Sequence, residues 1–241
     1  MRSRATGARR RPAVLDRSIL AAATLDAARA LIGAYLVRDD ATGRRVARID
    51  EVEAYIGEDD RASHARFGRT SRNETMWGIP GLAYVYLVYG MYDCLNVVTE
   101  PAGRPAAVLV RAATPTAGSD AMRASRIEHA LGRRRLDGPA GEAEAARIRS
   151  LPVERLTLGP GVLAAAFGLD RTWTGTDLCD PRSPLRIEPC GPDEPAPAVV
   201  ATPRIGVGYA GEPWVSRPWR LLALDSIGAR TAGTHRGRPH R

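Results

Sequence analysis

The sequence of 241 residues contains no lysine, so all 35 of its Lys and Arg positions are arginine. A lysine ε-amine is therefore excluded as a nucleophile. Cysteine is scarce: the three cysteines have no C-x-x-C spacing, and with only four scattered histidines they form no zinc motif. No apolar run approaches the roughly 20 residues of a membrane span. We expect no metal, no cofactor, no membrane segment and no signal peptide, in a reduced, cytoplasmic setting.

Positive charge dominates the ionic residues that are present. The net charge is +8, and a basic balance of this size favours a polyanionic partner, of which nucleic acid is the commonest. Both ends of the chain are rich in arginine and poor in large apolar side chains. We interpret residues 1–17 as a flexible basic arm, 18–228 as one domain and 229–241 as a flexible basic tail.

Apolar periodicity predicts alternating helices and strands along the domain. Helices are expected where apolar residues recur every three or four positions, over 25–36, 119–131, 142–149 and 163–168. Strands are expected where β-branched and aromatic residues concentrate, over 44–55, 83–88, 95–99 and 106–112. Residues 181–200 are rich in proline and predict strand and loop. The pattern allows a mixed α/β fold with a hairpin around Gly90.

The first candidate for chemistry is a pair of carboxylates on one predicted strand. Because side chains alternate across a strand, Glu51, Glu53 and Tyr55 point to one face and Val52 and Ala54 to the other. Two carboxylates beside a tyrosine form either a solvated outer surface or a reactive site. Strand geometry alone favours the solvated surface.

The second candidate is the segment 84–92, in which five of nine residues are tyrosine or methionine, within a chain that is only 5% aromatic. Tyr84 and Tyr86 share one strand face, and Tyr89 lies near the turn. Tyrosines in a buried hairpin are one interpretation. An exposed aromatic turn that stacks on bases or inserts between them is the other.

Several unusual segments occur in the order and with the spacing found in the alkyladenine (3-methyladenine) DNA glycosylase family. The chain resembles this family from Leu25 to Leu224, nearly its whole length. The matching segments are Glu51–Tyr55, Ser63-His64, Arg69–Asn73, Tyr84–Tyr92, Asn96, Arg111, Gly159–Gly161 and Arg204–Gly208.

The resemblance implies a reaction and the residues that perform it. Glu53 is expected to activate a water molecule that attacks the sugar carbon. Arg111 and the main-chain carbonyl of Ile205 are expected to hold that water. Because no lysine is present to form a Schiff base, the resemblance and the composition both indicate hydrolysis without strand cleavage.

The resemblance also implies how DNA is bound. A flipped purine is expected between Tyr55 and Tyr86, with His64 at its edge or at the adjacent phosphate, while Asn96 and Leu109 border the pocket and crowd the amino group of guanine. Tyr89 is expected to fill the gap left in the duplex. The residues expected near the DNA backbone are Arg69, Arg72, Gly159, Gly161 and Gly206.

The family's fold is a single mixed α/β (α+β) domain with a curved, mostly antiparallel sheet, flanking helices and a protruding β-hairpin, similar to the C-terminal domain of formyltransferases. The partner that the resemblance implies is double-stranded DNA containing damaged purines, bound by a monomer. Three alternatives stay open: a non-catalytic damage- or nucleic-acid-binding module, an RNA-directed protein of the same fold group, and a metal-dependent nuclease using Glu51, Glu53, Asp59 and Asp60.

Overall fold

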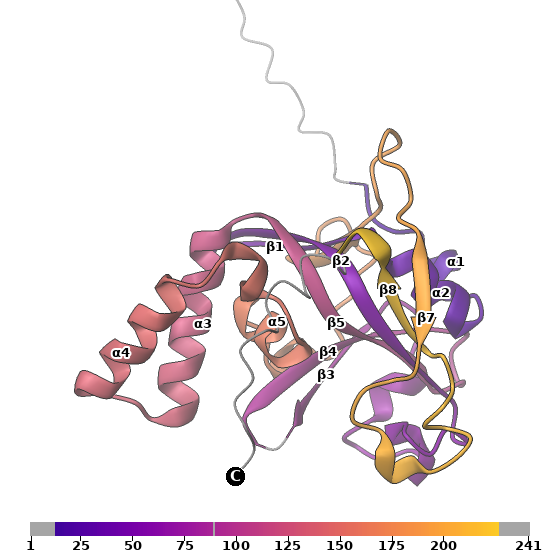
Figure 1. Ribbon diagram of the computed structural model, residues 1–241. Helices are drawn as coiled ribbons and strands as arrows, with labels where there is room; N and C mark the ends of the chain where they lie inside the picture. The colour runs from indigo at the N-terminus through magenta and orange to yellow at the C-terminus, as the bar shows by residue number, and fades with distance from the viewer. Residues whose placement is uncertain (1–12, 89, 227–241) are drawn as a thin grey trace, which may run out of the picture.

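The computed structural model describes residues 13–88 and 90–226, which form a mixed α/β domain around one antiparallel sheet (Figure 1). The strand order is β3-β4-β5-β2-β1-β6, and β8 pairs with both β2 and β7. This confirms the predicted mixed fold on a mostly antiparallel sheet. The strands are β1 (Tyr35–Asp40), β2 (Gly43–Ile56), β3 (Ala83–Val88), β4 (Tyr92–Val98), β5 (Ala106–Ala117), β6 (Leu185–Glu188), β7 (Val199–Thr202) and β8 (Arg220–Ala223).

Helices and single 3-10 turns surround the sheet. The α-helices are α1 (Arg17–Leu20), α2 (Thr24–Leu31), α3 (Ser119–Arg134), α4 (Gly138–Arg149) and α5 (Pro160–Ala166). The 3-10 turns are η1 (His64–Phe67), η2 (Glu74–Trp77), η3 (Val153–Leu156), η4 (Arg171–Trp173) and η5 (Gly208–Ala210). Within the described ranges, no helix combines the length and the apolar character needed to cross a membrane.

The two faces of the sheet have different surroundings. Residues directly opposite each other in antiparallel strands lie on the same face. Val52 pairs with Val110, and Val97 with Val108. These valines belong to the main hydrophobic core, which also contains Leu31 of α2, Met122 of α3 and Phe167 next to α5. Helices α2, α3 and α5 therefore cover this face of the sheet. The opposite face is not covered by these helices.

The helix predicted over 25–36 is shorter in the structure, and a strand was missed. Helix α2 ends at Leu31, and Gly33 follows with a φ of 90°, which interrupts helical geometry. Leu36 belongs to β1, where it pairs with Ala47 on one side and Ile187 on the other. The neighbouring strands of the sheet, and not a helix packing on a core, bury the Leu36 side chain. Its helical spacing from Ile32 was therefore misleading.

Figure 1 shows α3 and α4 as an antiparallel pair at one side of the molecule, with the β3–β4 hairpin beside them. The segments 57–79 and 203–218 lie together at the opposite side, and the hydroxyl of Tyr209 donates to the Ala62 carbonyl at 3.2 Å. Gly90 takes a φ of 71° in the hairpin turn. Tyr89 lies outside the described residues, as do most of the predicted arm and the whole predicted tail. Leu15 and Arg17, within the predicted arm, pack on the domain.

Candidate active site

Glu53 lies on the face of β2 that is turned away from the main core, and its side chain is 0% exposed. One carboxylate oxygen, Oε1, accepts a hydrogen bond from the main-chain N–H of Ile205 at 2.8 Å and lies 3.3 Å from Nη1 of Arg111. The other, Oε2, accepts from the Tyr55 hydroxyl at 2.8 Å. The structure thus brings together the three predicted catalytic residues. Ile205 faces Glu53 with its N–H, whereas the sequence analysis assigned a role to its carbonyl.

Two β-bulges set the direction of the Arg111 side chain. The register of β2 and β5 shifts on both sides of Glu51, which pairs with Ala112, while Val52 pairs with Val110. Arg111 is therefore the extra residue of β5 and Asp50 the extra residue of β2. A bulge bends the strand and redirects side chains, as is common beside active sites. Arg111 thereby reaches both Glu53 and Glu51, whose Oε1 accepts from its Nε at 3.1 Å.

The carboxylate pair is buried and neutralised by arginine, so the solvated-surface interpretation was wrong. The side chain of Glu51 is only 8% exposed and lies between Arg111 and Arg220, whose Nη1 is 3.0 Å from it. Burial alone would lower the pKa of Arg111, but the charges of Glu53 and Glu51 raise it. Burial, followed by the charge of Glu53, raises the pKa of Tyr55 well above that of a free phenol. Tyr55 therefore remains a hydrogen-bond donor to Glu53 at neutral pH.

An aromatic cavity of about 60 Å³ lies next to this carboxylate. It contains four of the five predicted base-binding residues and is connected to Glu53 through Tyr55. The sequence analysis did not assign Met76, Tyr84 or Tyr209 to it, and only the strand face shared by Tyr84 and Tyr86 could have suggested Tyr84. The lining residues are Tyr55, Ala62, His64, Met76, Tyr84, Tyr86, Asn96, Ala107 and Tyr209.

Sheet register explains why these residues meet. Tyr84 pairs with Asn96, Asn96 with Leu109, and Leu109 with Glu53, so one row crosses four strands on one face. Asn96 is fixed because its Nδ2 donates to the carbonyls of Tyr84 at 3.0 Å and Cys94 at 3.3 Å. Leu109 is buried between Asn96 and Glu53 in this row and is not among the residues that line the cavity.

His64 begins the 3-10 turn η1 and stands edge-on to Tyr86, with 4.4 Å between the ring centroids. Its Nδ1 is 3.0 Å from the hydroxyl of Tyr84. Burial, together with the charges of Arg72 and Arg66, lowers the pKa of His64 to about 4. Burial also raises the pKa of Tyr84 to about 12. Both rings are therefore neutral near pH 7 and present a polar edge to the cavity without a formal charge.

A buried ion pair positions the loop that carries Ile205. Arg204 and Asp60 have side chains that are 0% exposed, with Nη1 of Arg204 2.6 Å from the carboxylate. The Arg204 guanidinium also donates to the Ala54 carbonyl at 2.9 Å and lies over the rings of Tyr55 and Trp219. The sequence predicted no role in the site for Arg204, and for Asp60 only that of a metal ligand in the nuclease alternative.

The residues predicted near the DNA backbone lie in separate segments. Arg69 pairs with Glu74 at 2.8 Å on the exterior, and Arg72 donates to the Leu87 carbonyl of β3 at 3.1 Å. Gly159 and Gly206 take φ values of 122° and 76°, which favour glycine. Gly161 approaches the Tyr92 ring so closely that a Cβ there would lie 2.7 Å from it. Among the described residues, no group of three or more His, Cys, Asp or Glu side chains is arranged to hold a metal ion.

The fold and the site define a mixed α/β protein in which a buried, arginine-held carboxylate adjoins an aromatic cavity. Residues 18–226 match the model of the methylpurine-DNA glycosylase family. The chain is 44% identical to a protein of Methanocella arvoryzae over 214 residues, 88% of this chain and 94% of that protein. It is 43% identical to a protein of Myxococcus xanthus over 88% of this chain and 91% of the relative. Both relatives carry the name "Putative 3-methyladenine DNA glycosylase".

The chain therefore belongs to the methylpurine-DNA glycosylase family. It is a DNA glycosylase, a hydrolase that acts on N-glycosyl bonds, and a DNA repair protein.

Proposed function

We propose that this DNA glycosylase flips a damaged purine out of duplex DNA and hydrolyses its N-glycosidic bond with water activated by Glu53. The observation that carries the proposal is the environment of Glu53, a fully buried carboxylate that contacts Arg111, Ile205 and Tyr55 beside an aromatic cavity. The names of the relatives, which specify 3-methyladenine, support an N-alkylated purine as substrate.

In the proposed reaction a water oxygen attacks the anomeric carbon of the deoxyribose. One water proton passes to the Glu53 carboxylate, and the electron pair of the glycosidic bond leaves with the base. The products are a free base and an abasic site. Arg111 and the Ile205 main chain hold Glu53 and the water in place. A positioned general base accelerates such a step by roughly a hundred- to ten-thousand-fold.

Substrate selection combines leaving-group quality with the shape of the cavity. N-alkylated purines such as 3-methyladenine are cationic and leave easily, and damage that weakens base pairing lowers the few kcal/mol that flipping costs. Stacking between Tyr55 and Tyr86 returns about 1–3 kcal/mol. Asn96 crowds the amino group of normal guanine, and Leu109 lies next to Asn96 in the same row of the sheet.

The proposed contacts with the rest of the duplex follow from the same arrangement. Arg69, Arg72, Gly159, Gly161 and Gly206 contact the backbone, and Tyr89, outside the described residues, fills the gap left by the flipped base. A single chain suffices for this task, so the enzyme acts as a monomer. Analytical ultracentrifugation of the enzyme alone is expected to show a monomer, and with one duplex a one-to-one complex. A stable dimer would overturn this part of the proposal.

The experiment that tests the function measures single-turnover base release from duplexes carrying hypoxanthine or ethenoadenine and from methylated DNA, in excess chelator. The wild-type enzyme is expected to release damaged bases and to leave the strand intact until alkali is added. Borohydride is expected to trap no covalent complex, because the chain has no lysine to form a Schiff base. Tight lesion binding without base release would favour the damage-binding module instead, and strand cleavage without alkali would exclude the hydrolytic route.

A further inference from the structure

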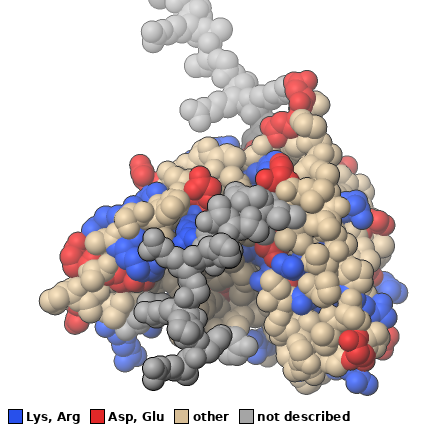
Figure 2. All heavy atoms as spheres, in the orientation of Figure 1, with Lys and Arg blue, Asp and Glu red and all other residues tan. Residues whose placement is uncertain are grey.

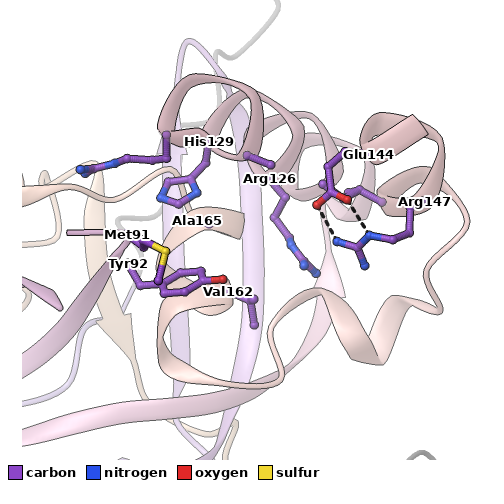
Figure 3. A pocket seen from close by; sticks show the side chains of 11 residues that line it. Met91, Tyr92, Arg126, His129, Glu144, Arg147, Val162 and Ala165 are labelled. Atoms are coloured by element: carbon purple, nitrogen blue, oxygen red, sulfur yellow. Dashed lines mark hydrogen bonds and ion pairs between the residues drawn. The ribbon is translucent and has the colours of Figure 1, made fainter. Parts of the chain in front are cut away.

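A second cavity, of about 550 Å³, lies between α3, α4, α5 and the start of β4 (Figure 3). It shares no lining residue with the aromatic cavity. It adjoins the β3–β4 hairpin through Met91, the last residue of the turn, and Tyr92, the first residue of β4. The lining residues are Met91, Tyr92, Arg126, His129, Ala130, Arg133, Glu144, Arg147, Ile148, Val162 and Ala165.

One half of this cavity is aromatic and apolar. Figure 3 shows Tyr92 and His129 beside each other at one side, with Met91 next to them. The planes of the two rings differ by only 17°, and their centroids are 6.3 Å apart. Met91 is 51% exposed. This half offers flat, partly accessible surfaces against which a base or a sugar can pack.

The other half is cationic. Arg126 is buried and fixed, because its Nη1 donates to the carbonyls of Arg155 at 2.9 Å and Leu156 at 3.3 Å. Nε and Nη2 of Arg147 each lie 2.7 Å from the Glu144 carboxylate, a pair in which Nη1 takes no part (Figure 3).

The lining also includes Arg133, whose partner is Asp93 at 2.6 Å. The three arginines of the lining thus have two carboxylate partners, Glu144 and Asp93, so the cavity keeps an excess of positive charge. In a half-enclosed cavity such an excess attracts an anion.

We propose that this cavity binds one nucleotide unit of the DNA strand that runs past the hairpin. The phosphate lies at Arg126 and Arg147, and the sugar or base packs against Tyr92 and His129. The volume suits such an occupant, since sites for small organic groups measure roughly 300–1,000 Å³. Figure 2 shows basic and acidic side chains interspersed over α3 and α4, so the charge that favours an anion is that of the cavity lining itself. The proposal rests on the proposed function for the presence of duplex DNA.

A first pair of variants tests the cationic half. Arg147 and Arg149 both lie on α4, are about half exposed and pair with a glutamate, but only Arg147 lines the cavity. Duplex binding is measured by fluorescence anisotropy at a series of salt concentrations. Arg147→Ala is expected to weaken binding severalfold and to reduce the salt slope by about 1, the loss of one phosphate contact. Arg149→Ala is expected to bind like the wild type.

A second pair predicts a gain of affinity, which a folding defect cannot produce. Glu144→Gln and Glu142→Gln each add one unit of positive charge and each release an arginine on α4. Only Glu144→Gln releases an arginine inside the cavity. It is expected to tighten duplex binding severalfold, and Glu142→Gln to change binding less than twofold. Equal effects within both pairs would overturn the proposal, because general charge and not the cavity would then govern binding.

Base release by the same proteins at saturating enzyme separates this proposal from the proposed function. Arg149→Ala is expected to keep the wild-type single-turnover rate, because Arg149 lines neither cavity. If the wild-type enzyme releases no base but the two pairs differ as stated, the proposed function fails and the cavity proposal stands. If base release is normal and the pairs do not differ, the cavity proposal alone fails.

Discussion

At the scale of single residues, the site combines groups whose charge is fixed by their surroundings. Glu53 and Glu51 are buried only because Arg111 and Arg220 compensate them. A buried charge without a partner would cost several kcal/mol. His64 meets the same requirement in another way, since its burial favours the neutral imidazole. The aromatic cavity is therefore lined by neutral groups, whereas the charges gather around the carboxylate pair.

The lowered pKa of His64 predicts a dependence of stability on pH. The folded protein holds this group unprotonated down to about pH 4, whereas the unfolded chain protonates it near 6.5. The stabilising contribution is therefore complete above pH 6.5 and is lost as the pH falls toward 4. The full shift corresponds to about 3 kcal/mol at most.

Urea titrations of wild type and His64→Gln between pH 4 and 7 measure this contribution as a difference. The free energy of unfolding of the wild type is expected to fall more steeply with decreasing pH than that of the variant. Parallel curves for the two proteins would contradict a neutral, buried His64.

At the scale of elements, two segments far apart in sequence complete the site together. The loop before η5 supplies the Ile205 N–H, and the turn after β2 supplies Asp60, which holds Arg204. Asp60 also accepts from the main-chain N–H groups of Ile56 at 3.2 Å and Ala62 at 3.0 Å. The Arg204–Asp60 pair therefore connects the ends of the two segments directly beside Glu53.

Replacing Asp60 by asparagine is expected to destabilise the domain by about 3–5 kcal/mol, because Arg204 would stay buried without its counter-charge. The Asp60→Asn protein that remains folded is also expected to release bases more slowly, because the Ile205 N–H would shift away from Glu53. Asp59→Asn is the matched control, because Asp59 is an exposed neighbour. Thermal unfolding and single-turnover base release measure the two effects. Equal melting temperatures for both variants would contradict this role of the pair.

Local patterns predicted most elements but not how strands shift against each other. The bounds of β3 agree with the predicted 83–88, because its β-branched and aromatic residues occupy a simple hairpin. Leu36 shows the limit, since spacing cannot distinguish burial by a helix from burial by neighbouring strands. The bulge at Arg111 and the pairing of Arg204 with Asp60 depend on contacts between distant segments. Those features decide how Glu53 is held, and local periodicity does not contain them.

At the scale of the whole molecule, positive charge is the main long-range property. With a net charge of +8 and only arginine as its cationic side chain apart from histidine, the enzyme is expected to bind DNA mainly through guanidinium–phosphate contacts. Each such contact releases counterions, so affinity falls steeply with salt.

Binding of a lesion duplex between 50 and 200 mM salt is expected to weaken by roughly a thousandfold or more if six or more phosphates are contacted. Anisotropy titrations with lesion and undamaged duplexes measure the slope. A nearly flat dependence would mean that the charge of the molecule does not serve DNA binding.

The central claim is that Glu53, and not the neighbouring carboxylate, is the general base. Glu51→Gln is the matched control, because both residues lie on β2 and both contact Arg111. Single-turnover release of ethenoadenine or hypoxanthine from a duplex is the measurement. Glu53→Gln is expected to lower the rate by about a hundredfold or more, and Glu51→Gln to keep most of it. Equal rates for wild type and Glu53→Gln, or a larger loss in Glu51→Gln, would contradict this claim.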